Sequence, residues 1–247
     1  IYRGARVLRN HFGRISQVSQ KGAFDLVTEA DTESEKQIIE TIWETFPDHA
    51  IWAEESGRNK GTAEYQWLID PLDGTTNYVH QLPFFTISIA LAVGGNIELG
   101  LILNPMDGEL YSAIVGKGAE LNGKPINVSS ITSVSDSLLI TGFPYDFNEI
   151  VDPAMKRFSV CQQASQGVRR LGSAALDFCY VACGRFDGFW EQNLHPWDKA
   201  AGVIIAAEAG AVITDFSNQP FSINQKEILV TNGRIHQEML SLLNLTD

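Results

Sequence analysis

Hydrophobic and polar positions follow two different periods along this chain, and the pattern predicts both helices and strands. Between Thr32 and Thr45, apolar side chains recur at the spacing of one buried helix face. From residue 84 to residue 121, short apolar runs are separated by turn-forming stretches such as Gly95-Asn96. That arrangement is typical of antiparallel strands joined by tight turns. The chain is therefore expected to combine an antiparallel meander with αβ segments.

The same pattern gives expected boundaries for the elements. Helices are expected at residues 1–14, 32–45, 153–164, 173–183 and 199–209. Strands are expected at residues 51–53, 66–69, 84–93, 97–103, 110–115, 119–121, 138–141, 186–192, 211–215 and 228–231. Residues 15–27 and 56–64 are expected to be loops. A soft boundary near residues 130–137 divides an N-terminal αβ unit (residues 1–135), which holds the antiparallel sheet, from a C-terminal αβ unit (residues 136–247).

Composition and charge exclude several classes of protein. A chain of 247 residues with 44% hydrophobic side chains can bury a sizeable core. The net charge of −12 argues against a nucleic-acid partner, because phosphate backbones are bound mainly by Lys and Arg. No apolar run approaches the ~18 residues of a membrane span, so no membrane partner is expected. Three cysteines without zinc spacing, and the lack of a signal-peptide pattern, favour a cytoplasmic location.

One short segment carries the strongest chemical signal. An apolar run, Trp67-Leu68-Ile69, ends at Asp70, and a second carboxylate, Asp73, precedes Gly74 and Thr75. Pro71 makes a rigid turn between the two carboxylates, so both can point at one spot. Mg²⁺ prefers oxygen ligands and is often held by a few carboxylates together with substrate phosphate. Backbone N–H groups at the helix start expected after Asp73 can hold an anion. The segment therefore predicts a Mg²⁺-dependent site for phosphate esters.

Three further acidic clusters also lie at strand ends or helix starts, where α/β proteins often bind ligands. Each cluster has an ordinary explanation as well. Asp31 and Asp198 could be helix caps, and the pair Glu54-Glu55 could be exposed loop charges. The Asp70–Asp73 segment could be a simple turn. The four clusters together favour a shared site.

Two other motifs are set aside. Gly118 to Lys124 have the spacing of a phosphate-binding loop, but Pro125 follows where a Ser or Thr should hold Mg²⁺. Asn122-Gly123 within the same stretch predicts a hairpin turn instead. No Gly-x-Gly-x-x-Gly follows a strand, so the fingerprint of a dinucleotide fold is missing.

Taken in order, these motifs resemble the inositol monophosphatase family of Mg²⁺-dependent, lithium-sensitive sugar-phosphate phosphatases. The resemblance covers nearly the whole chain. It is nearest to the bacterial, broad-substrate branch, through the segment Arg169-Arg170-Leu171-Gly172-Ser173-Ala174-Ala175-Leu176-Asp177. The matching segments are Asp25-Leu26-Val27-Thr28 with Asp31, Glu54-Glu55-Ser56, Asp70-Pro71-Leu72-Asp73-Gly74-Thr75-Thr76-Asn77, Gly172-Ser173-Ala174-Ala175, and Trp197-Asp198-Lys199-Ala200-Ala201-Gly202 running on to Glu208-Ala209-Gly210-Ala211.

The resemblance implies a layered αβαβα sandwich, an α+β or α/β fold, and hydrolysis of a phosphate monoester. It further implies a sugar or polyol phosphate as substrate, a homodimer, and two or three Mg²⁺ ions per active site. Two of these ions would activate water, with Asp70 shared between them. The metal ligands carried over by resemblance are Glu54, Asp70, the Leu72 carbonyl, Asp73 and Asp198.

The remaining roles also come from the resemblance. Asp31 and Thr75, helped by Glu54, would orient and deprotonate the attacking water. The N–H groups of Gly74 and Thr75 would hold phosphate oxygens. Lys21, in the loop before Asp25, stands where the family often has a lysine. The polyol side would be lined by Gly172, Ser173, Ala174 and Glu191, with Glu191 accepting sugar hydroxyls.

Inositol 1-phosphate is the expected substrate. Relatives that act on fructose 1,6-bisphosphate, NADP, histidinol phosphate or 3′-phosphoadenosine phosphate leave alternatives open. Thr76 favours the inositol-type group, because the nucleotide group typically has Lys at that position. A different class is a binding protein that keeps the fold and regulates a partner.

Overall fold

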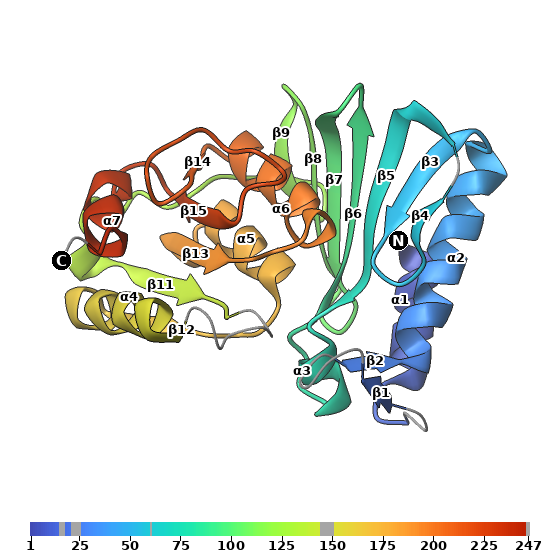
Figure 1. Cartoon of the computed structure of the whole chain (residues 1–247), viewed down its shortest axis with the longest axis horizontal. Coiled ribbons are helices and arrows are strands. Elements are labelled where there is room, and N and C mark those ends of the chain that lie inside the picture. The colour runs from blue at the N-terminus through green and yellow to red at the C-terminus, as the bar shows by residue number, and fades with distance from the viewer. Residues whose placement is uncertain (15–17, 21–25, 60, 144–150, 246–247) are drawn as a thin grey trace.

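The computed structural model describes residues 1–14, 18–20, 26–59, 61–143 and 151–245. Its elements stack in five layers, in the order helix, sheet, helix, sheet, helix (Figure 1). Each sheet has one face against the central helices and the other against an outer helix pair. This layering confirms the expected α+β sandwich. Within the described ranges, no helix has the length and apolar character needed to span a bilayer.

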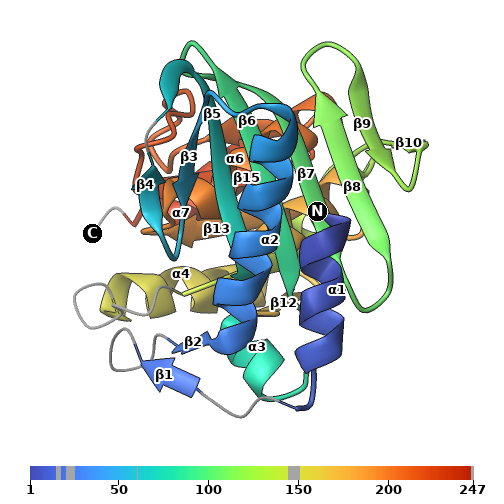
Figure 2. The same cartoon turned by 90° about the vertical axis from the view of Figure 1, so that its right-hand side faces the viewer.

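The larger sheet has eight strands in the order β10-β9-β8-β7-β6-β5-β3-β4. All neighbouring strands pair antiparallel except β3 and β5, which run parallel. The helices α1 (Tyr2–His11) and α2 (Glu29–Thr45) cover its outer face (Figure 2). The strands are β3 (His49–Ala53), β4 (Gly57–Asn59), β5 (Thr62–Asp73), β6 (Thr86–Val93), β7 (Asn96–Asn104), β8 (Glu109–Ile114), β9 (Gly118–Leu121) and β10 (Lys124–Ile126).

The smaller sheet has five strands in the order β12-β11-β13-β15-β14. Its strands are β11 (Leu138–Thr141), β12 (Gly167–Arg169), β13 (Gly188–Gln192), β14 (Val212–Thr214) and β15 (Glu227–Thr231). The central layer consists of α5 (Ala174–Ala182) and α6 (Pro196–Glu208), and the outer layer of α4 (Val151–Ala164) and α7 (His236–Leu243). Because α6 lies after residue 135 and packs on the larger sheet, the division into two units at that residue stays a prediction.

Several sequence expectations are corrected by the structure. Parts of both expected loops are strands: β1 (Val18–Gln20) pairs with β2 (Leu26–Thr28), and β4 lies between residues 56 and 64. The helix expected from residue 32 begins at Glu29, because Thr28 and Asp31 form a capping box. The helix start expected after Asp73 is confirmed by the short helix α3 (Thr75–Val79). The pattern missed β10, β12, α7 and the 3₁₀ turn η1 (Val134–Asp136). These elements are too short to show a clear hydrophobic period.

The central layer depends on a close approach between α6 and β7. Gly100 on β7 lies directly under α6, and a Cβ at this position would come within 2.5 Å of Ile204 Cγ2 and 2.6 Å of the Ala201 carbonyl oxygen. The second of these atoms belongs to the helix backbone, which cannot yield as a side chain can. Glycine at position 100 therefore sets how closely α6, which carries Asp198, lies on the larger sheet.

Gly100→Ala is expected to lower the free energy of unfolding by about 1–3 kcal/mol, the usual cost of overpacking a close-packed core. Denaturant unfolding measures the change. Gly188→Ala on β13 is the matched control, because its nearest atom would be a flexible Leu139 side-chain carbon at 3.2 Å. An equal loss of unfolding free energy in both variants would show that the packing of α6 on the larger sheet does not depend on Gly100.

Candidate active site

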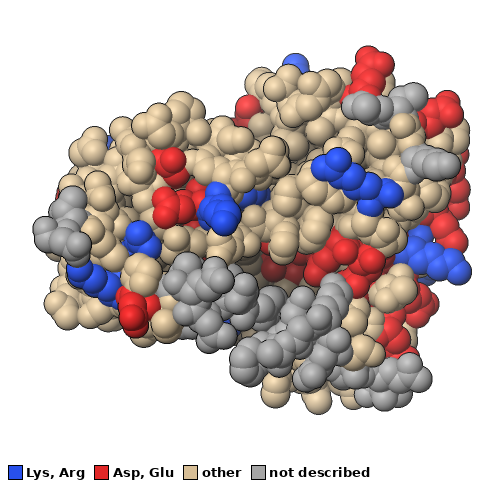
Figure 3. Space-filling view, in the orientation of Figure 1, with Lys and Arg blue, Asp and Glu red and all other residues tan. Residues whose placement is uncertain are grey.

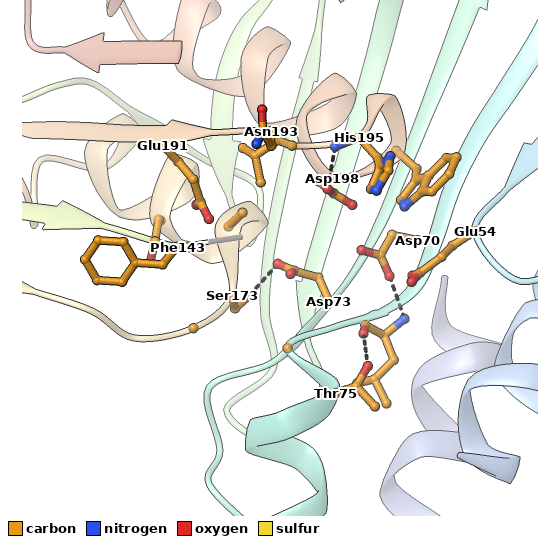
Figure 4. Close-up of a pocket in the computed structure, with 18 of the residues that line it drawn as sticks. Glu54, Asp70, Asp73, Thr75, Phe143, Ser173, Glu191, Asn193, His195 and Asp198 are labelled. Carbon is orange, nitrogen blue, oxygen red and sulfur yellow. Dashed lines mark hydrogen bonds between the residues drawn. The ribbon is translucent and has the colours of Figure 1, made fainter. Parts of the chain in front are cut away.

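A cavity of about 660 Å³ opens where the two sheets and the central helices meet, and the sequence-predicted residues gather around it. Figure 4 shows carboxylates from the larger sheet on one side and Glu191 from the smaller sheet on the other. Four of the acidic residues that line the cavity come from three segments: the end of β3, β5 and α6. We call them the carboxylate quartet: Glu54, Asp70, Asp73 and Asp198.

Glu54 is placed by the end of β3. Its backbone N–H donates to the Ile69 carbonyl at 3.1 Å, which extends the parallel pairing of β3 with β5 by one residue. The next two N–H groups, of Glu55 and Ser56, both donate to the buried Glu35 carboxylate on α2 at 2.9 Å. This turn is therefore held to α2, and it keeps Glu54 at the cavity.

Asp70 and Asp73 lie on either side of an irregularity in β5. The register with β6 shifts between them, so the strand bends and both side chains reach the cavity. Asp70 is only 2% exposed, and its carboxylate accepts the Leu72 N–H at 2.9 Å. The bend is fixed to α2 as well, because Ser34 donates to the Pro71 carbonyl at 3.2 Å. The bend in β5 therefore presents two carboxylates to one space, but Pro71 lies in a strand that continues to Asp73 and not in the turn that was expected after residue 69.

Asp73 ties the larger sheet to α5. One of its carboxylate oxygens accepts the Ser173 hydroxyl at 2.6 Å and the Ala175 N–H at 2.7 Å. Gly74 follows with φ +95°, and a Cβ there would meet the Phe84 and Gly172 carbonyl oxygens at 3.0 and 3.1 Å. Only glycine fits both the conformation and the space. The segment after Asp73 therefore lies closely against the loop that leads into α5.

Asp31 does not line the cavity, but its carboxylate contacts the hydroxyl of Thr75, which does. Its Oδ2 accepts the Thr28 N–H at 2.9 Å and the Thr28 hydroxyl at 2.5 Å. The Thr75 hydroxyl lies 3.2 Å from Asp31 Oδ1 and 3.1 Å from the Leu72 carbonyl oxygen. Burial raises the pKa of Asp31 to about 6, and the Thr28 hydrogen bonds counteract this rise. A carboxyl group with such a pKa can take up and release a proton near neutral pH.

Asp198 stands at a different helix position than expected. The N-cap of α6 is His195, and Pro196 begins the helix, so Asp198 is the third helical residue rather than the cap. Its carboxylate accepts the His195 N–H at 2.7 Å. Proline is favoured at the first position of a helix, so α6 begins at Pro196, three residues before the start expected from the sequence. The carboxylate still faces the cavity (Figure 4).

The opposite wall of the cavity carries Gly172, Ser173, Ala174 and Glu191, as the resemblance implies. Glu191 on β13 is 6% exposed, and burial raises its pKa to about 8. Sequence reasoning assigned no role to Asp177 or Arg170, which also line this wall. Asp177 is 1% exposed, and neither of its carboxyl oxygens has a hydrogen-bond partner in the part of the chain that the structure describes. The sequence did offer one signal: Asp177 lies three residues after Ala174, so both are expected on the same face of a helix.

Burial, followed by repulsion between neighbouring carboxylates, determines the electrostatics of the quartet. Burial, and then the charges of the other three members, raise the pKa of Asp70 well above its usual value. Burial also raises the pKa of Asp73 to about 6 and that of Asp198 well above its usual value. Acidic side chains line a hollow near the middle of the face in Figure 3, with basic side chains on both sides. The quartet is strongly acidic, and Arg170 and Lys226 are basic residues that line the same cavity.

The donor set suits a hard divalent cation, because every quartet member offers carboxylate oxygen. The Leu72 carbonyl, which also lines the cavity, adds a further oxygen. Among the side chains that the structure describes, no group of three His, Cys, Asp or Glu is already closed into a metal-binding cluster. The carboxylates thus share one cavity and feel one another's charge without forming a complete coordination shell.

Comparison with known proteins decides the family. The model of the inositol monophosphatase family matches residues 1–245. The chain belongs to the inositol monophosphatase family. It is 45% identical to an inositol-1-monophosphatase of Synechocystis sp., over 95% of this chain and 83% of that protein. It is 41% identical to the Nus factor SuhB of Escherichia coli K12, over 91% of this chain and 85% of that protein.

A solved structure agrees with this assignment. The inositol monophosphatase from Anabaena sp. superposes with a TM-score of 0.90 at 42% identity, and the match covers 100% of this chain and 92% of the other. The chain is therefore an enzyme of a family of phosphatases. Lys21 and Asp25, noted from the resemblance, lie outside the described residues.

The raised pKa values predict how the stability of the metal-free protein depends on pH. Asp31 and Asp73 bind protons more tightly in the folded protein, with pKa values of about 6, than at the ordinary value of 3.8. The free energy of unfolding should therefore fall as the pH rises through that interval, and stay low above it. Thermal unfolding in the presence of a chelator measures this fall.

Asp70→Asn should remove part of the repulsion and keep the acceptor for the Leu72 N–H. At pH 7 in chelator it should raise the free energy of unfolding by roughly 1–3 kcal/mol. Glu120→Gln, an exposed acidic residue on β9, is the control and should change little. A destabilised Asp70→Asn would contradict the repulsion inferred for the quartet.

Proposed function

We propose that this chain hydrolyses a phosphate monoester of a polyol, with inositol 1-phosphate as the first candidate. The observation that carries the proposal is the quartet, four carboxylates from three distant segments around one cavity. Family membership and the relative named inositol-1-monophosphatase support the substrate class. The family is generally Mg²⁺-dependent, which agrees with the oxygen-only donor set.

Two Mg²⁺ ions fit the residues present. Glu54, Asp70 and the Leu72 carbonyl would hold one ion, and Asp70, Asp73 and Asp198 would hold the other. The Leu72 carbonyl has a second lone pair beside the one that faces Thr75. When bound, such a pair of ions lowers the pKa of water and neutralises the charge of the phosphate and the leaving oxygen.

The chain's own groups would prepare the nucleophile. The Thr75 hydroxyl lies between Asp31 and the Leu72 carbonyl, so it can accept a hydrogen bond from water while it donates to Asp31. A proton leaving the water can therefore pass to Asp31, whose pKa of about 6 suits a base near neutral pH. Glu54 faces the same space and would help to orient the water (Figure 4). No side chain needs to form a covalent intermediate.

The phosphate and the leaving group would be held on opposite sides. The backbone N–H groups of Gly74 and Thr75 stand at the start of α3, where such groups lack partners inside the helix and can donate to phosphate oxygens. Glu191 lies across the cavity, where it can accept hydroxyls of a polyol leaving group. The backbone of Gly172, Ser173 and Ala174 closes this side.

A second candidate is a role exercised through a protein partner. Relatives named Nus factor SuhB, at 41% identity, support this alternative. The two roles are compatible, because a phosphatase site does not occupy the outer surface. Phosphatases for fructose 1,6-bisphosphate, NADP, histidinol phosphate or 3′-phosphoadenosine phosphate are alternatives within the enzyme class. The homodimer, lithium sensitivity and cytoplasmic location implied earlier stay predictions.

Release of inorganic phosphate, with and without Mg²⁺, tests the function. We expect release from inositol 1-phosphate only with Mg²⁺, and a loss of at least about 1,000-fold in Asp73→Asn, because the charge that it removes serves the metal and the transition state directly. Asp136→Asn, exposed and far from the cavity, is the control.

Two outcomes would contradict the proposal. Near-normal turnover in Asp73→Asn would refute the metal assignment. No release from inositol 1-phosphate or from any phosphate ester named above would favour the role through a protein partner.

A further inference from the structure

Glu191 can occupy its place only because residue 142 has no side chain. Gly142 directly follows β11 and lines the cavity beside Glu191. A Cβ on Gly142 would come within 3.0 Å of both carboxyl oxygens of Glu191 and of its carboxyl carbon, a separation that real Cβ atoms essentially never show. Gly142 does not adopt a left-handed φ, unlike Gly74. Glycine is therefore required at residue 142 because a side chain would overlap Glu191, and not because of the backbone conformation.

The backbone around this contact is fixed and cannot relieve an overlap. β11 pairs parallel with β13, with Thr141 opposite Trp190, and the Thr141 hydroxyl donates to the Trp190 carbonyl at 2.6 Å. On its other side β13 pairs antiparallel with β15, with Glu191 opposite Ile228. Because β13 is held on both sides, a methyl group at residue 142 must displace the Glu191 side chain.

Surrounding charges decide where a displaced carboxyl group would go. Asp177, which is buried and has no hydrogen-bond partner for either oxygen among the described residues, and Asp73 both lie close enough to Glu191 for charge to act between them. Both are acidic and disfavour a second negative charge. Arg170 lies exposed at the cavity and attracts Glu191 instead. A substituted residue 142 would therefore drive Glu191 out toward Arg170, away from the leaving group.

We propose that Gly142 is a positioning residue that holds the Glu191 carboxyl group where it can accept hydroxyls of the leaving group. Residue 142 thereby controls discrimination between polyol phosphates and phosphate esters without hydroxyls. This inference rests on the proposed phosphatase function, and it adds a determinant of substrate choice outside the metal side of the cavity.

The test compares kcat and KM for two substrates: inositol 1-phosphate and phenyl phosphate, whose leaving group carries no additional hydroxyl. At pH 9, above the pKa of about 8 that burial gives Glu191, Gly142→Ala should lower kcat/KM for inositol 1-phosphate by about 10- to 100-fold, the usual effect of losing a hydrogen bond to a charged group, mainly through KM. For phenyl phosphate the change in kcat/KM should stay within about threefold, because its leaving group has no additional hydroxyl that Glu191 could accept. Gly188→Ala, which adds a methyl group on β13 away from the cavity, should leave the ratio unchanged.

A double-mutant cycle shows whether residue 142 acts through Glu191. Glu191→Ala alone should lose the same discrimination, and adding Gly142→Ala should then change kcat/KM by less than about twofold, because the overlapping carboxyl group is gone. Glu191→Asp combined with Gly142→Ala should recover part of the discrimination, since the shorter side chain leaves room for the methyl group. In a crystal structure of Gly142→Ala, the Glu191 carboxyl group should lie nearer Arg170.

The inference is overturned if Gly142→Ala slows both substrates equally, if its full effect persists in Glu191→Ala, or if Glu191 does not move in the crystal structure. Failure of the proposed function has a different signature. In that case the unaltered protein releases phosphate from neither substrate in Mg²⁺, and the inference falls with it. If the unaltered protein is active but the effect of Gly142→Ala does not depend on Glu191, the phosphatase function is retained and the role of Gly142 is rejected.

Discussion

Mutual repulsion among buried carboxylates is the constraint on which this molecule depends. Asp70, Asp73 and Asp198 all have raised pKa values, because each is removed from water and faces other acids. Such groups would move apart if they were free to do so. They are held by donors from rigid parts of the chain, among them the Leu72 N–H, the Ala175 N–H and the His195 N–H. The fold therefore holds these carboxylates together at a cost in electrostatic free energy, and a bound divalent cation can lower that cost.

The layered architecture explains how this cost is sustained. The larger sheet and α2 fix the side of the cavity that holds Glu54 and Asp70, and the central helices bring Asp198 and the partners of Asp73 to it. The smaller sheet supplies Glu191 from the opposite direction. The metal side and the leaving-group side are therefore built on separate sheets. Specificity can change on one side while the metal ligands on the other stay in place.

The sequence predicted the chemistry of the site better than its detailed geometry. Asp70 and Asp73 were recognisable because an apolar run ends at an Asp-Pro pair, and the structure places both at the cavity. Asp177 was not recognised as part of the wall, because its helical spacing from Ala174 was the only signal and an apolar helix does not show which of its faces lines a cavity. Gly142 could not be found either, since only the folded sheet brings it against Glu191.

The same limit applies to the secondary structure. The long strands of the meander and the longer helices were expected near their true positions, because several periods of the hydrophobic pattern define them. β1, β4 and β10 have three residues each, too few for a period, and they form through pairing with a neighbouring strand. Tertiary pairing, rather than local preference, creates these elements.

Proton release on Mg²⁺ binding tests the central claim most directly, because a cation that binds carboxyl groups kept protonated by burial and mutual repulsion must displace those protons. Calorimetric titration of the metal-free protein with Mg²⁺ near pH 6.5, in two buffers of different ionisation enthalpy, measures the number released. A quartet with raised pKa values predicts net release in the unaltered protein and less in Asp70→Asn. Binding without proton release, or equal release in both proteins, would contradict it.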